Sequence, residues 1–497
     1  MSIDIKIREI APARVQTGLL AVPVTDKGLG EGLAKRLDRQ LKGRLAALVK
    51  KSGFTAKSGS SLLVATHGVM PAGHVLLVGL GKQDEEESPH AWRVAGAVAA
   101  REAGRIWVDE AVFMLPPDRQ TGMVAGAVAE GALLCAYRFD KYRSNGRRNG
   151  VPRTLVVGRN ASGGSAALAR AARQARVTAS AVCLARDLVN EPASTATASY
   201  LSEQAVAHCV GEGLKVEVWG KRKIQQMKLA GLLAVNQGSR EEPRFLHMRY
   251  RPKAKPRRKV ALIGKGITFD SGGLSLKPPR SMETMKLDMA GGAAVIAVMS
   301  ALPKLAPDVE VLGLVPATDN LPDGGAQKPG DVIRYLNGKT VEVMNTDAEG
   351  RLILADALLL AAREKPDCMI NLATLTGACI VALGNELAGL FSNDGDLAET
   401  LTACGRDAGE SLWRLPLPAE YREDIKSQVA DIKNVGAGSA GAITAALFLQ
   451  EFVDDVPWAH LDIAGPAFAG KDRVTCPKGG TGFGVRTLLN FLSCTGD

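Results

Sequence analysis

Charged side chains gather in three short, glycine-containing segments of the chain, each beside an apolar run. ALIGKGITFDSGGLSLKP occupies positions 261–278, METMKLDMAGGAA positions 282–294 and VEVMNTDAEGR positions 341–351. The charged residues of interest in them are Lys265, Asp270, Lys277, Asp288, Asp347, Glu349 and Arg351. In α/β sheets the ligand site lies outside the carboxyl ends of the strands, so we expect the three segments to meet in one crevice.

The four carboxylates of this set need compensation where they meet, because like charges in one pocket raise each other's pKa. Two divalent cations supply four positive charges, and oxygen ligands suit Mn²⁺, Mg²⁺ or Zn²⁺ better than a soft-ligand metal. Such a centre would generate a bound hydroxide and polarise a carbonyl, which is the chemistry of metal-assisted hydrolysis. Lys277 and Arg351 would remain to stabilise an oxyanion. Lys265 could ligate a metal only as a neutral amine whose pKa is lowered by burial and by the nearby cation.

Each of these residues, taken alone, also has a simpler explanation. Asp347 and Asp288 stand at the start of helical runs and could cap them. Asp270 could form a turn, and the three basic residues could be surface cations. The joint occurrence of all seven in three strand-terminal loops favours a site.

Other catalytic motifs are absent from the sequence. The six histidines form no HExxH pair, so a histidine-based zinc site is not indicated. FDSGG around Ser271 lacks the first glycine of a serine hydrolase elbow, which makes Ser271 a turn residue. No P-loop or GxGxxG follows a strand.

The elements that position these residues predict two α/β domains. Residues 17–160 alternate short apolar runs with helical patterns such as 31–51, which is typical of βα units in a mostly parallel sheet. We expect a smaller N-terminal domain at 1–165 and an alanine-rich connecting helix at 166–192. The larger C-terminal domain, 193–497, should contain a mixed central sheet flanked by helices.

Composition indicates a packed chain without a membrane segment. It has 497 residues, of which 46% are hydrophobic and 23% charged, and its net charge is +10. The N-terminus lacks the order of a signal peptide, and the longest apolar stretches are too short to span a bilayer. The eight cysteines are scattered and predict reduced thiols in the core. We therefore expect a cytoplasmic protein with no membrane partner.

Four segments carry a family resemblance. GKGITFDSGGLSLKP, MKLDMAGGAA, NTDAEGRLILADAL and NLATLTGA, in this order, resemble the signature segments of the leucine aminopeptidase (cytosol aminopeptidase) family, bacterial type. The resemblance covers residues from about 180 to 490 well and the N-terminal domain only loosely. It implies a two-metal exopeptidase that releases unblocked N-terminal residues, leucine and others, from peptides.

The resemblance also implies a role for each charged residue. One metal ion, Mn²⁺, Zn²⁺ or Mg²⁺, would be bound by Lys265, Asp270, Asp288 and Glu349. The second would be bound by Asp270, Asp347 and Glu349, so two of the carboxylates would bridge. Lys277 would hold the tetrahedral gem-diolate, and Arg351 would position a bicarbonate ion that shuttles the proton.

Further family positions imply a substrate pocket and an assembly. The pocket and substrate contacts would come from Met285, Asn345, Thr374, Leu375 and Gly377. Met285, Leu375 and Gly377 are also explained as ordinary core or turn residues. The family implies a homohexamer, which would favour short peptides with a free N-terminus and a setting in intracellular peptide and protein turnover.

Two rival functions stay open. The run HMRYRPKAKPRRK at 247–259 has seven cations within eleven residues, and a second basic run lies at 137–153. They suit DNA binding in recombination or transcription control, beside or instead of peptidase activity, although each run could be a solvated loop. The same carboxylates would also suit a two-metal phosphatase.

Overall fold

The computed structural model describes residues 3–30, 32–82, 88–144, 150–160 and 164–494. The chain divides into two compact units. The N-terminal unit comprises Met1–Ser180 with Lys471–Lys478, and the C-terminal unit comprises Ala181–Gly470 with Gly479–Asp497. The division falls within α5, which runs from Ser165 to Asn190. Both units combine sheets with helices, so the prediction of a two-domain α/β chain is confirmed.

The N-terminal unit is built on a six-stranded sheet in the order β1-β6-β5-β2-β4-β3. Its strands are β1 (Asp4–Glu9), β2 (Leu19–Val24), β3 (Ser61–Ala65), β4 (His74–Gly79), β5 (Glu110–Met114) and β6 (Thr154–Arg159). All neighbouring pairs are parallel except β3 with β4. The mostly parallel sheet expected from the alternating pattern is therefore present.

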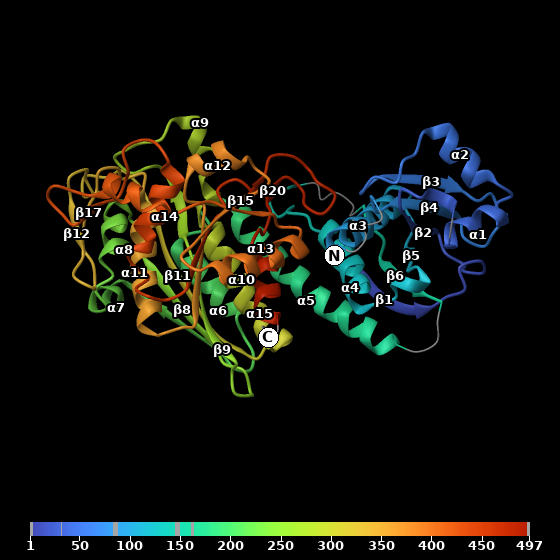
Figure 1. The fold of residues 1–497 in the computed structure, drawn as a ribbon, viewed down its shortest axis with the longest axis horizontal. Helices are drawn as coiled ribbons and strands as arrows, with labels where there is room; N and C mark the ends of the chain where they lie inside the picture. The colour runs from blue at the N-terminus through green and yellow to red at the C-terminus, as the bar shows by residue number, and fades with distance from the viewer. Residues whose placement is uncertain (1–2, 31, 83–87, 145–149, 161–163, 495–497) are drawn as a thin grey trace. The chain divides into compact units, whose positions relative to one another are not determined.

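Helices cover both faces of this sheet (Figure 1). One face packs against α1 (Gly32–Gln40) and α2 (Arg44–Ser52), through a core that includes Leu20, Val22 and Leu37. The other face packs against α3 (Pro89–Arg105), α4 (Gly122–Cys135) and the first half of α5. The helical run at 31–51 forms two helices, because Lys42 and Gly43 adopt left-handed conformations with φ of 53° and 79°.

The C-terminal unit contains a nine-stranded mixed sheet in the order β16-β15-β18-β14-β9-β11-β8-β7, with β10 beside β11. The strands are β7 (Leu214–Trp219), β8 (Arg244–Tyr250), β9 (Arg258–Gly264), β10 (Gly266–Asp270), β11 (Val309–Asn320), β14 (Cys368–Ala373), β15 (Ala388–Ser392), β16 (Leu412–Arg414) and β18 (Trp458–Asp462). β18, β14, β9 and β11 are parallel neighbours, and their carboxyl ends share one edge.

Helices flank this sheet as predicted. One side has α7 (Lys221–Gln226), α8 (Ala230–Val235), α11 (Glu349–Arg363) and α14 (Gly441–Gln450). The remaining helices are α6 (Ala198–His208), α9 (Pro279–Met282), α10 (Ala290–Leu305), α12 (Gly377–Leu383), α13 (Gly395–Ala408) and α15 (Val485–Ser493). Small sheets are formed by β12 (Val332–Arg334), β13 (Thr340–Glu342) and β17 (Ile432–Lys433), and by β19 (Phe468–Ala469) and β20 (Gly479–Gly480).

A long apolar helical segment lies in the core of the C-terminal unit. In the described part of the chain, Met285–Leu305 is the one helical segment long and apolar enough to cross a membrane, and 83% of its most apolar window is buried. It therefore packs as a core helix. The eight cysteines are free thiols, and six of them are buried.

Candidate active site

The three charged segments meet at the carboxyl edge of the C-terminal sheet. Lys265 follows β9, Asp270 ends β10, and Asp288 lies in a short 3-10 helix, Met285–Met289, that leads into α10. Glu349 is the first residue of α11, two residues after Asp347. The expected convergence is present. For Lys265 and Asp270 it follows from strand positions, because β9 and β10 both run parallel to β11, whereas β13, the strand before Asp347 and Glu349, belongs to a separate three-stranded sheet.

Lys265 joins two of the carboxylates. Its Nζ atom lies 2.8 Å from both carboxylate oxygens of Asp288 and 2.9 Å from Oε1 of Glu349. The main-chain oxygen of Thr374 accepts a further hydrogen bond of 3.0 Å from the same ammonium. The side chain of Lys265 is only 4% exposed, so all of its partners belong to the protein.

Lys277 joins the other two carboxylates. Its Nζ atom lies 2.9 Å from Oδ2 of Asp270 and 2.5 Å from Oδ1 of Asp347. Ligand oxygens of Asp270, Asp347 and Glu349 lie within 4.8 Å of one another, which is close enough for a shared metal ion. Lysine ammonium groups thus stand between carboxylates that a cation would otherwise bridge.

Buried neutral groups hold these side chains in place. Asn320, at the end of β11, donates through Nδ2 to Oδ1 of Asp270 at 2.8 Å and to the main-chain oxygen of Thr346 at 3.0 Å. Thr346 donates to the main-chain oxygen of Gly272 at 2.6 Å and accepts from the N–H of Ser275 at 2.8 Å. The loops that carry Asp270 and Asp347 are therefore tied together before any ligand binds.

The pKa values of three of the carboxyl groups are raised above their ordinary values. Burial raises the pKa of Glu349 to about 8, and the neighbouring charge of Asp270 adds to the effect. Burial raises the pKa of Asp288 to about 6, although Lys265 opposes it. Burial also raises the pKa of Asp347 against the hydrogen bond from Lys277. Perturbed groups of this kind, clustered at a sheet edge, are typical of functional sites.

The charge balance of the cluster fits divalent metal ions. When all four carboxylates are ionised, as metal binding requires, they exceed the two ammonium groups by two negative charges in a buried setting. Oε2 of Glu349 is buried and has no hydrogen-bond partner among the described residues. Carboxylate oxygens are the donors that Mn²⁺, Mg²⁺ and Zn²⁺ accept, so the residues present fit such ions.

Lys265 differs from the sequence expectation in one respect. Burial would lower its pKa, but the charges of Asp288 and Glu349 outweigh burial and hold the pKa above its ordinary value. The lysine is therefore an ammonium ion as long as the carboxylates are its only charged partners. A cation beside the carboxylates would remove that stabilisation, which is what ligation by a neutral amine requires.

Arg351 lies on the first turn of α11 as a buried cation. Burial lowers its pKa to about 10, so the guanidinium stays charged at neutral pH. Its NH1 atom donates to the main-chain oxygen of Asn434 at 2.6 Å, and its Nε has no acceptor within the described part of the chain. A donor remains for a small anion.

Two of the predicted substrate residues also support the cluster. Thr374 donates through Oγ1 to Oδ1 of Asp288 at 2.7 Å, in addition to accepting from Lys265. Oδ1 of Asn345 accepts the N–H of Asp347 at 2.8 Å, which orients that carboxylate. These side chains are committed to positioning their neighbours.

The other three predicted substrate residues lie beside the cluster. Met285 begins the 3-10 helix of Asp288 and is half-buried. Leu375 is half-buried in the segment after β14, and Gly377 is exposed at the start of α12. All three lie on the segments that carry or adjoin the carboxylates.

The sequence patterns missed three buried residues that organise the site. They are Asn320, Asn434 and Asp462. Asp462 accepts from the N–H of Leu375 at 3.2 Å and from Oγ1 of Thr376 at 2.7 Å, and thereby fixes the segment after β14. Asp462 could have been predicted from its place at the end of the apolar run WAHLD. No sequence pattern marked Asn320 or Asn434.

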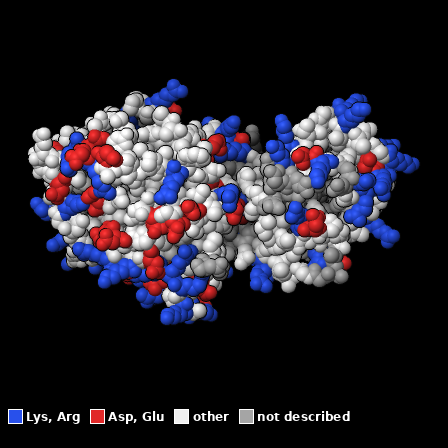
Figure 2. Space-filling model, viewed as in Figure 1, with Lys and Arg blue, Asp and Glu red and all other residues white. Residues whose placement is uncertain are grey.

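Four of the seven cations in the basic run at 247–259 form ion pairs, with Glu212, Glu310 or Glu364. Arg249 pairs with Glu310 and Glu364 at 2.9 Å each, and Lys259 pairs with Glu364 at 2.9 Å. Figure 2 shows Lys and Arg beside Asp and Glu at the lower edge of the C-terminal unit, where Figure 1 places the β8–β9 connection. Part of the second basic run, residues 145–149, lies outside the described residues.

Both units match family models. Residues 183–489 match the model described as "Cytosol aminopeptidase family, catalytic domain", and residues 21–146 match the corresponding N-terminal domain model. A probable cytosol aminopeptidase of Syntrophotalea carbinolica is 44% identical over 484 residues, covering 96% of this chain and 97% of the relative.

Solved structures are similar over nearly the whole chain. The bottromycin maturation enzyme BotP in complex with Mn is 38% identical with a TM-score of 0.83, covering 96% of this chain and 99% of BotP. A tomato leucine aminopeptidase variant is 34% identical with a TM-score of 0.88, covering 99% of this chain and 96% of the tomato chain.

Proposed function

The chain belongs to the cytosol aminopeptidase family of peptidase hydrolases, and from that premise we propose that it releases unblocked N-terminal residues from short peptides with two divalent metal ions. The observation that carries the two-metal proposal is the carboxylate cluster. It has an excess of negative charge, and Oε2 of Glu349 is buried without a partner among the described residues. Once Lys265 acts as a neutral ligand, the four ionised carboxylates and the ammonium of Lys277 would carry three net negative charges, which is more than one divalent ion supplies.

The two metal positions share their ligands. One would be bound by Lys265, Asp270, Asp288 and Glu349, and the other by Asp270, Asp347 and Glu349. Bound there, two divalent ions would polarise the peptide carbonyl and activate water at neutral pH. Mn²⁺ is supported by the BotP structure, which was solved in complex with Mn. Mg²⁺ shares the preference of Mn²⁺ for oxygen donors, and Zn²⁺ also binds carboxylate oxygens, beside nitrogen and sulfur.

Lys277 and Arg351 are the cations assigned to the reaction. The side chain of Lys277 is 15% exposed, against 4% for Lys265, so Lys277 is the lysine that a substrate oxygen can reach. Its ammonium would stabilise the negative charge that develops on that oxygen. Arg351, with a free Nε donor, would hold a bicarbonate ion near the reacting groups.

Substrate selection is assigned to the rim of the cluster. Met285, Thr374 and Gly377 would line the pocket for the first side chain of the peptide, and Asn345 and Leu375 would contact the substrate. The α-amino group of the substrate would bind at the metal centre, which explains a requirement for a free N-terminus.

We also propose a homohexamer in the cytoplasm that acts in peptide and protein turnover. Val381 on α12 is 90% exposed, and Leu276, in the loop that carries Lys277, is 60% exposed. The hexamer is proposed from the family resemblance, and these exposed apolar side chains are compatible with contacts between subunits. Sedimentation analysis tests the assembly, and a monomer at working concentrations would contradict it.

A peptidase assay with metal analysis tests the main proposal. We expect hydrolysis of leucyl peptides but not of their N-acetylated forms, loss of activity on chelation, and recovery with Mn²⁺. Two metal ions should be bound per chain, and Glu349→Gln should lower that number. The exposed Glu399→Gln on α13 serves as the charge-matched control. Hydrolysis of a phosphate ester in place of the peptides would favour the phosphatase alternative.

DNA binding stays a second prediction. Within the 247–259 run, the ion pairs of Arg249 and Lys259 reduce the charge available for phosphate contacts. A gel-shift titration at several salt concentrations decides it, because phosphate contacts give a steep dependence on salt. No binding at low ionic strength would exclude this role.

A further inference from the structure

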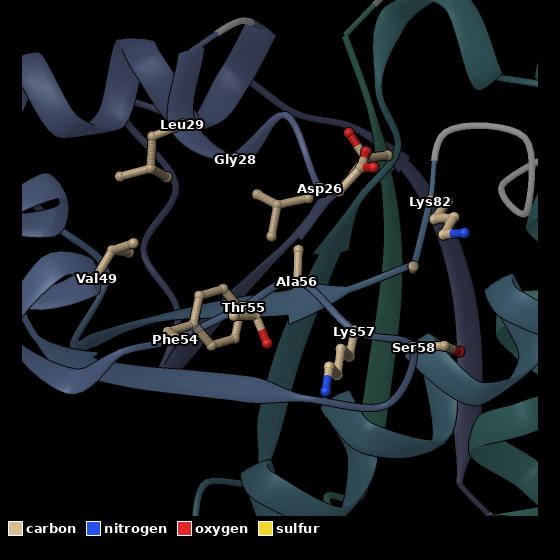
Figure 3. Close-up of a pocket in the computed structure, with 13 residues that line it drawn as sticks. Asp26, Gly28, Leu29, Val49, Phe54, Thr55, Ala56, Lys57, Ser58 and Lys82 are labelled. Carbon is tan, nitrogen blue, oxygen red and sulfur yellow. The ribbon is translucent and has the colours of Figure 1, made fainter.

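The N-terminal unit contains a cavity of about 570 Å³ with charges of both signs in its lining (Figure 3). Phe54 is among its apolar lining residues, and Asp26 and Lys57 contribute one charge of each sign. The sequence after the lining residue Lys82 includes four acidic residues at 84–87. The charges of the cavity therefore select no class of ligand, whereas a pair of thiols in the C-terminal unit selects its chemistry directly.

Two free cysteines of the C-terminal unit lie in contact. Sγ of Cys404, within α13, is 3.6 Å from Sγ of Cys494, which directly follows α15. The two residues are 90 positions apart in the sequence, so the packing of the two helices brings them together. In a disulfide the two sulfur atoms are about 2 Å apart. Only a small further approach therefore separates this pair from a covalent bond.

Hydrogen bonds to the main chain hold both cysteines in place. The N–H of Cys494 donates to the oxygen of Asn490 at 2.9 Å, and Nδ2 of Asn490 donates to the oxygen of Cys404 at 3.2 Å. NH2 of Arg257 donates to the oxygen of Cys494 at 3.4 Å. Asn490 thus contacts the main chain of both cysteines, which fixes the end of α15 against α13.

The two thiols differ in their access to solvent. Cys494 is exposed, whereas Cys404 is only 4% exposed. Burial raises the pKa of the Cys404 thiol to about 12, and the neighbouring Cys494 adds to the effect, so Cys404 stays protonated at neutral pH. An oxidant in solution therefore reaches Cys494 first. An accessible thiol beside a second thiol that can resolve it is the arrangement of redox-sensing cysteines.

The pair lies away from the carboxylate cluster. Arg257, which donates to Cys494, directly precedes β9, whereas Lys265 follows the other end of the same strand. The thiols are therefore near the sheet edge opposite the carboxylates. Their chemistry does not involve the proposed peptidase site, and a test of one does not depend on the other.

We propose that Cys494 and Cys404 form a reversible disulfide when the protein is exposed to hydrogen peroxide. The thiolate of Cys494 attacks one peroxide oxygen, the O–O bond breaks, and hydroxide leaves, which makes the sulfur a sulfenic acid. The sulfur of Cys404 then attacks the sulfenic sulfur, and its proton leaves with the displaced hydroxide as water. In total, two thiols and one peroxide give one disulfide and two water molecules.

The bond would be reversible and stabilising. Two molecules of a small thiol such as glutathione restore both cysteines by exchange and keep the disulfide between themselves. While it lasts, the bond joins α13 to the end of α15 and closes a loop across 90 positions. Closing a long loop restricts the unfolded chain. We therefore expect the oxidised protein to unfold at a higher urea concentration than the reduced protein.

Mass spectrometry of the full-length protein, reduced and then treated with hydrogen peroxide, tests the proposal. We expect the loss of two hydrogen atoms and a cross-linked peptide that contains Cys404 and Cys494, both reversed by dithiothreitol. In Cys404→Ser, Cys494 should remain a sulfenic acid that dimedone labels. Cys494→Ser should form neither product. Cys183→Ser, at a half-buried cysteine on α5, is the control and should form the disulfide as the natural chain does.

Four results would overturn the proposal: no cross-linked peptide, a disulfide between Cys494 residues of two chains, dimedone labelling of Cys404 in preference to Cys494, or equal urea midpoints of the oxidised and reduced proteins. Cys494→Ser changes an exposed side chain, and its circular dichroism establishes that it folds. Cys404→Ala provides a second variant at the buried position without a hydroxyl group, and it should give the same dimedone product as Cys404→Ser.

Discussion

NH1 of Arg351 donates a hydrogen bond of 2.6 Å to the main-chain oxygen of Asn434, although 83 residues separate the two in sequence. The side chain of Asn434 binds the neighbouring loop as well. Its Nδ2 donates to the oxygen of Asn345 at 2.7 Å, and its Oδ1 accepts the N–H of Met344 at 2.8 Å. One fully buried residue thus fixes both the loop of Asp347 and the guanidinium of Arg351.

Asn434→Ala should reduce activity by displacing this loop. The substitution removes the hydrogen bonds of the N–H of Met344 and the oxygen of Asn345, which are only partly buried, at about 0.5–1.5 kcal/mol for each bond. Because the loop carries a proposed metal ligand, we expect a loss in kcat/KM of about tenfold to a hundredfold. Peptidase assays with Mn²⁺ and urea unfolding measure the two effects.

Asn393→Ala is the matched control for this variant. Asn393 also bridges main-chain groups, accepting from the N–H of Trp458 at 2.7 Å and donating to the oxygen of Val456 at 3.1 Å. It lies after β15, at the sheet edge opposite the carboxylates. We expect it to lower stability and leave kcat/KM unchanged. Equal losses of kcat/KM in both variants would show that Asn434 acts on stability alone.

The raised pKa values of carboxyl groups in the cluster predict that the metal-free protein loses stability as the pH rises. The pKa of Glu349 in the folded chain is about 8, above its ordinary value, so the folded state keeps a proton that the unfolded state has released. The free energy of unfolding therefore falls as the pH rises from about 5 to about 8. Urea unfolding with chelator across this range measures the slope.

Glu349→Gln isolates the contribution of this one group. The amide cannot titrate, so the decrease in the free energy of unfolding between pH of about 5 and about 8 should be smaller than in the natural chain. Glu399→Gln on the surface should keep the natural slope. A slope unchanged by Glu349→Gln would mean that its proton affinity is the same in the folded and unfolded states.

Part of the site follows from the sequence because strand ends have a fixed place in a parallel sheet. Lys265 and Asp270 close apolar runs that form strands of one sheet, so their meeting at one edge needs only the rule for α/β sheets. The rule does not place Glu349, because β13, the strand before it, belongs to a separate three-stranded sheet. The same rule applies to Asp462, which ends β18. The ion pairs between the lysines and the carboxylates then follow from their opposite charges.

The supporting amides could not be predicted in this way. Asn434 lies just after the two-residue strand β17, and the partners of its side chain are main-chain groups 86 to 90 residues earlier. Main-chain donors and acceptors are present in every residue, so no side-chain pattern marks the partner. The break between α1 and α2 had a local signal in Gly43, which the helical periodicity of the run concealed.

Gly350→Ala should impair the metal centre and lower stability, because the buried ion pairs of Lys265 would be disturbed. A Cβ atom at Gly350 would lie 2.5 Å from Cε and 2.7 Å from Nζ of Lys265, whose ammonium is held by Asp288 and the oxygen of Thr374. The lysine must move, while alanine favours the helix by about 0.5–1 kcal/mol. We expect Mn²⁺ affinity to fall about tenfold or more, measured by calorimetry.

Gly395→Ala is the control for Gly350→Ala. It also replaces a glycine in the first turn of a helix, α13, but its Cβ would meet open space. Mn²⁺ affinity should equal that of the natural chain. If Gly350→Ala also binds Mn²⁺ normally, Lys265 does not contribute to the metal site.

The two long helices of the N-terminal unit approach through glycine. A Cβ atom at Gly131 of α4 would lie 1.8 Å from the main-chain oxygen of Arg93 on α3, and one at Gly96 would lie 2.1 Å from the oxygen of Val128. The buried ion pair of Arg93 with Glu130, at 2.7 Å, needs the same close approach. Backbone atoms cannot give way as side chains can, so the helices themselves would have to separate.

Gly131→Ala should therefore destabilise the N-terminal unit by about 1–3 kcal/mol, the usual range for overpacking, or more where the ion pair is also strained. Gly126→Ala in the same helix is the control, because its nearest neighbour, the Cβ of Ala171, lies at an ordinary 3.5 Å. Alanine there should be neutral or stabilising, since it favours the helix. Urea unfolding followed by circular dichroism compares the two variants, and equal midpoints would show that α3 and α4 can separate without cost.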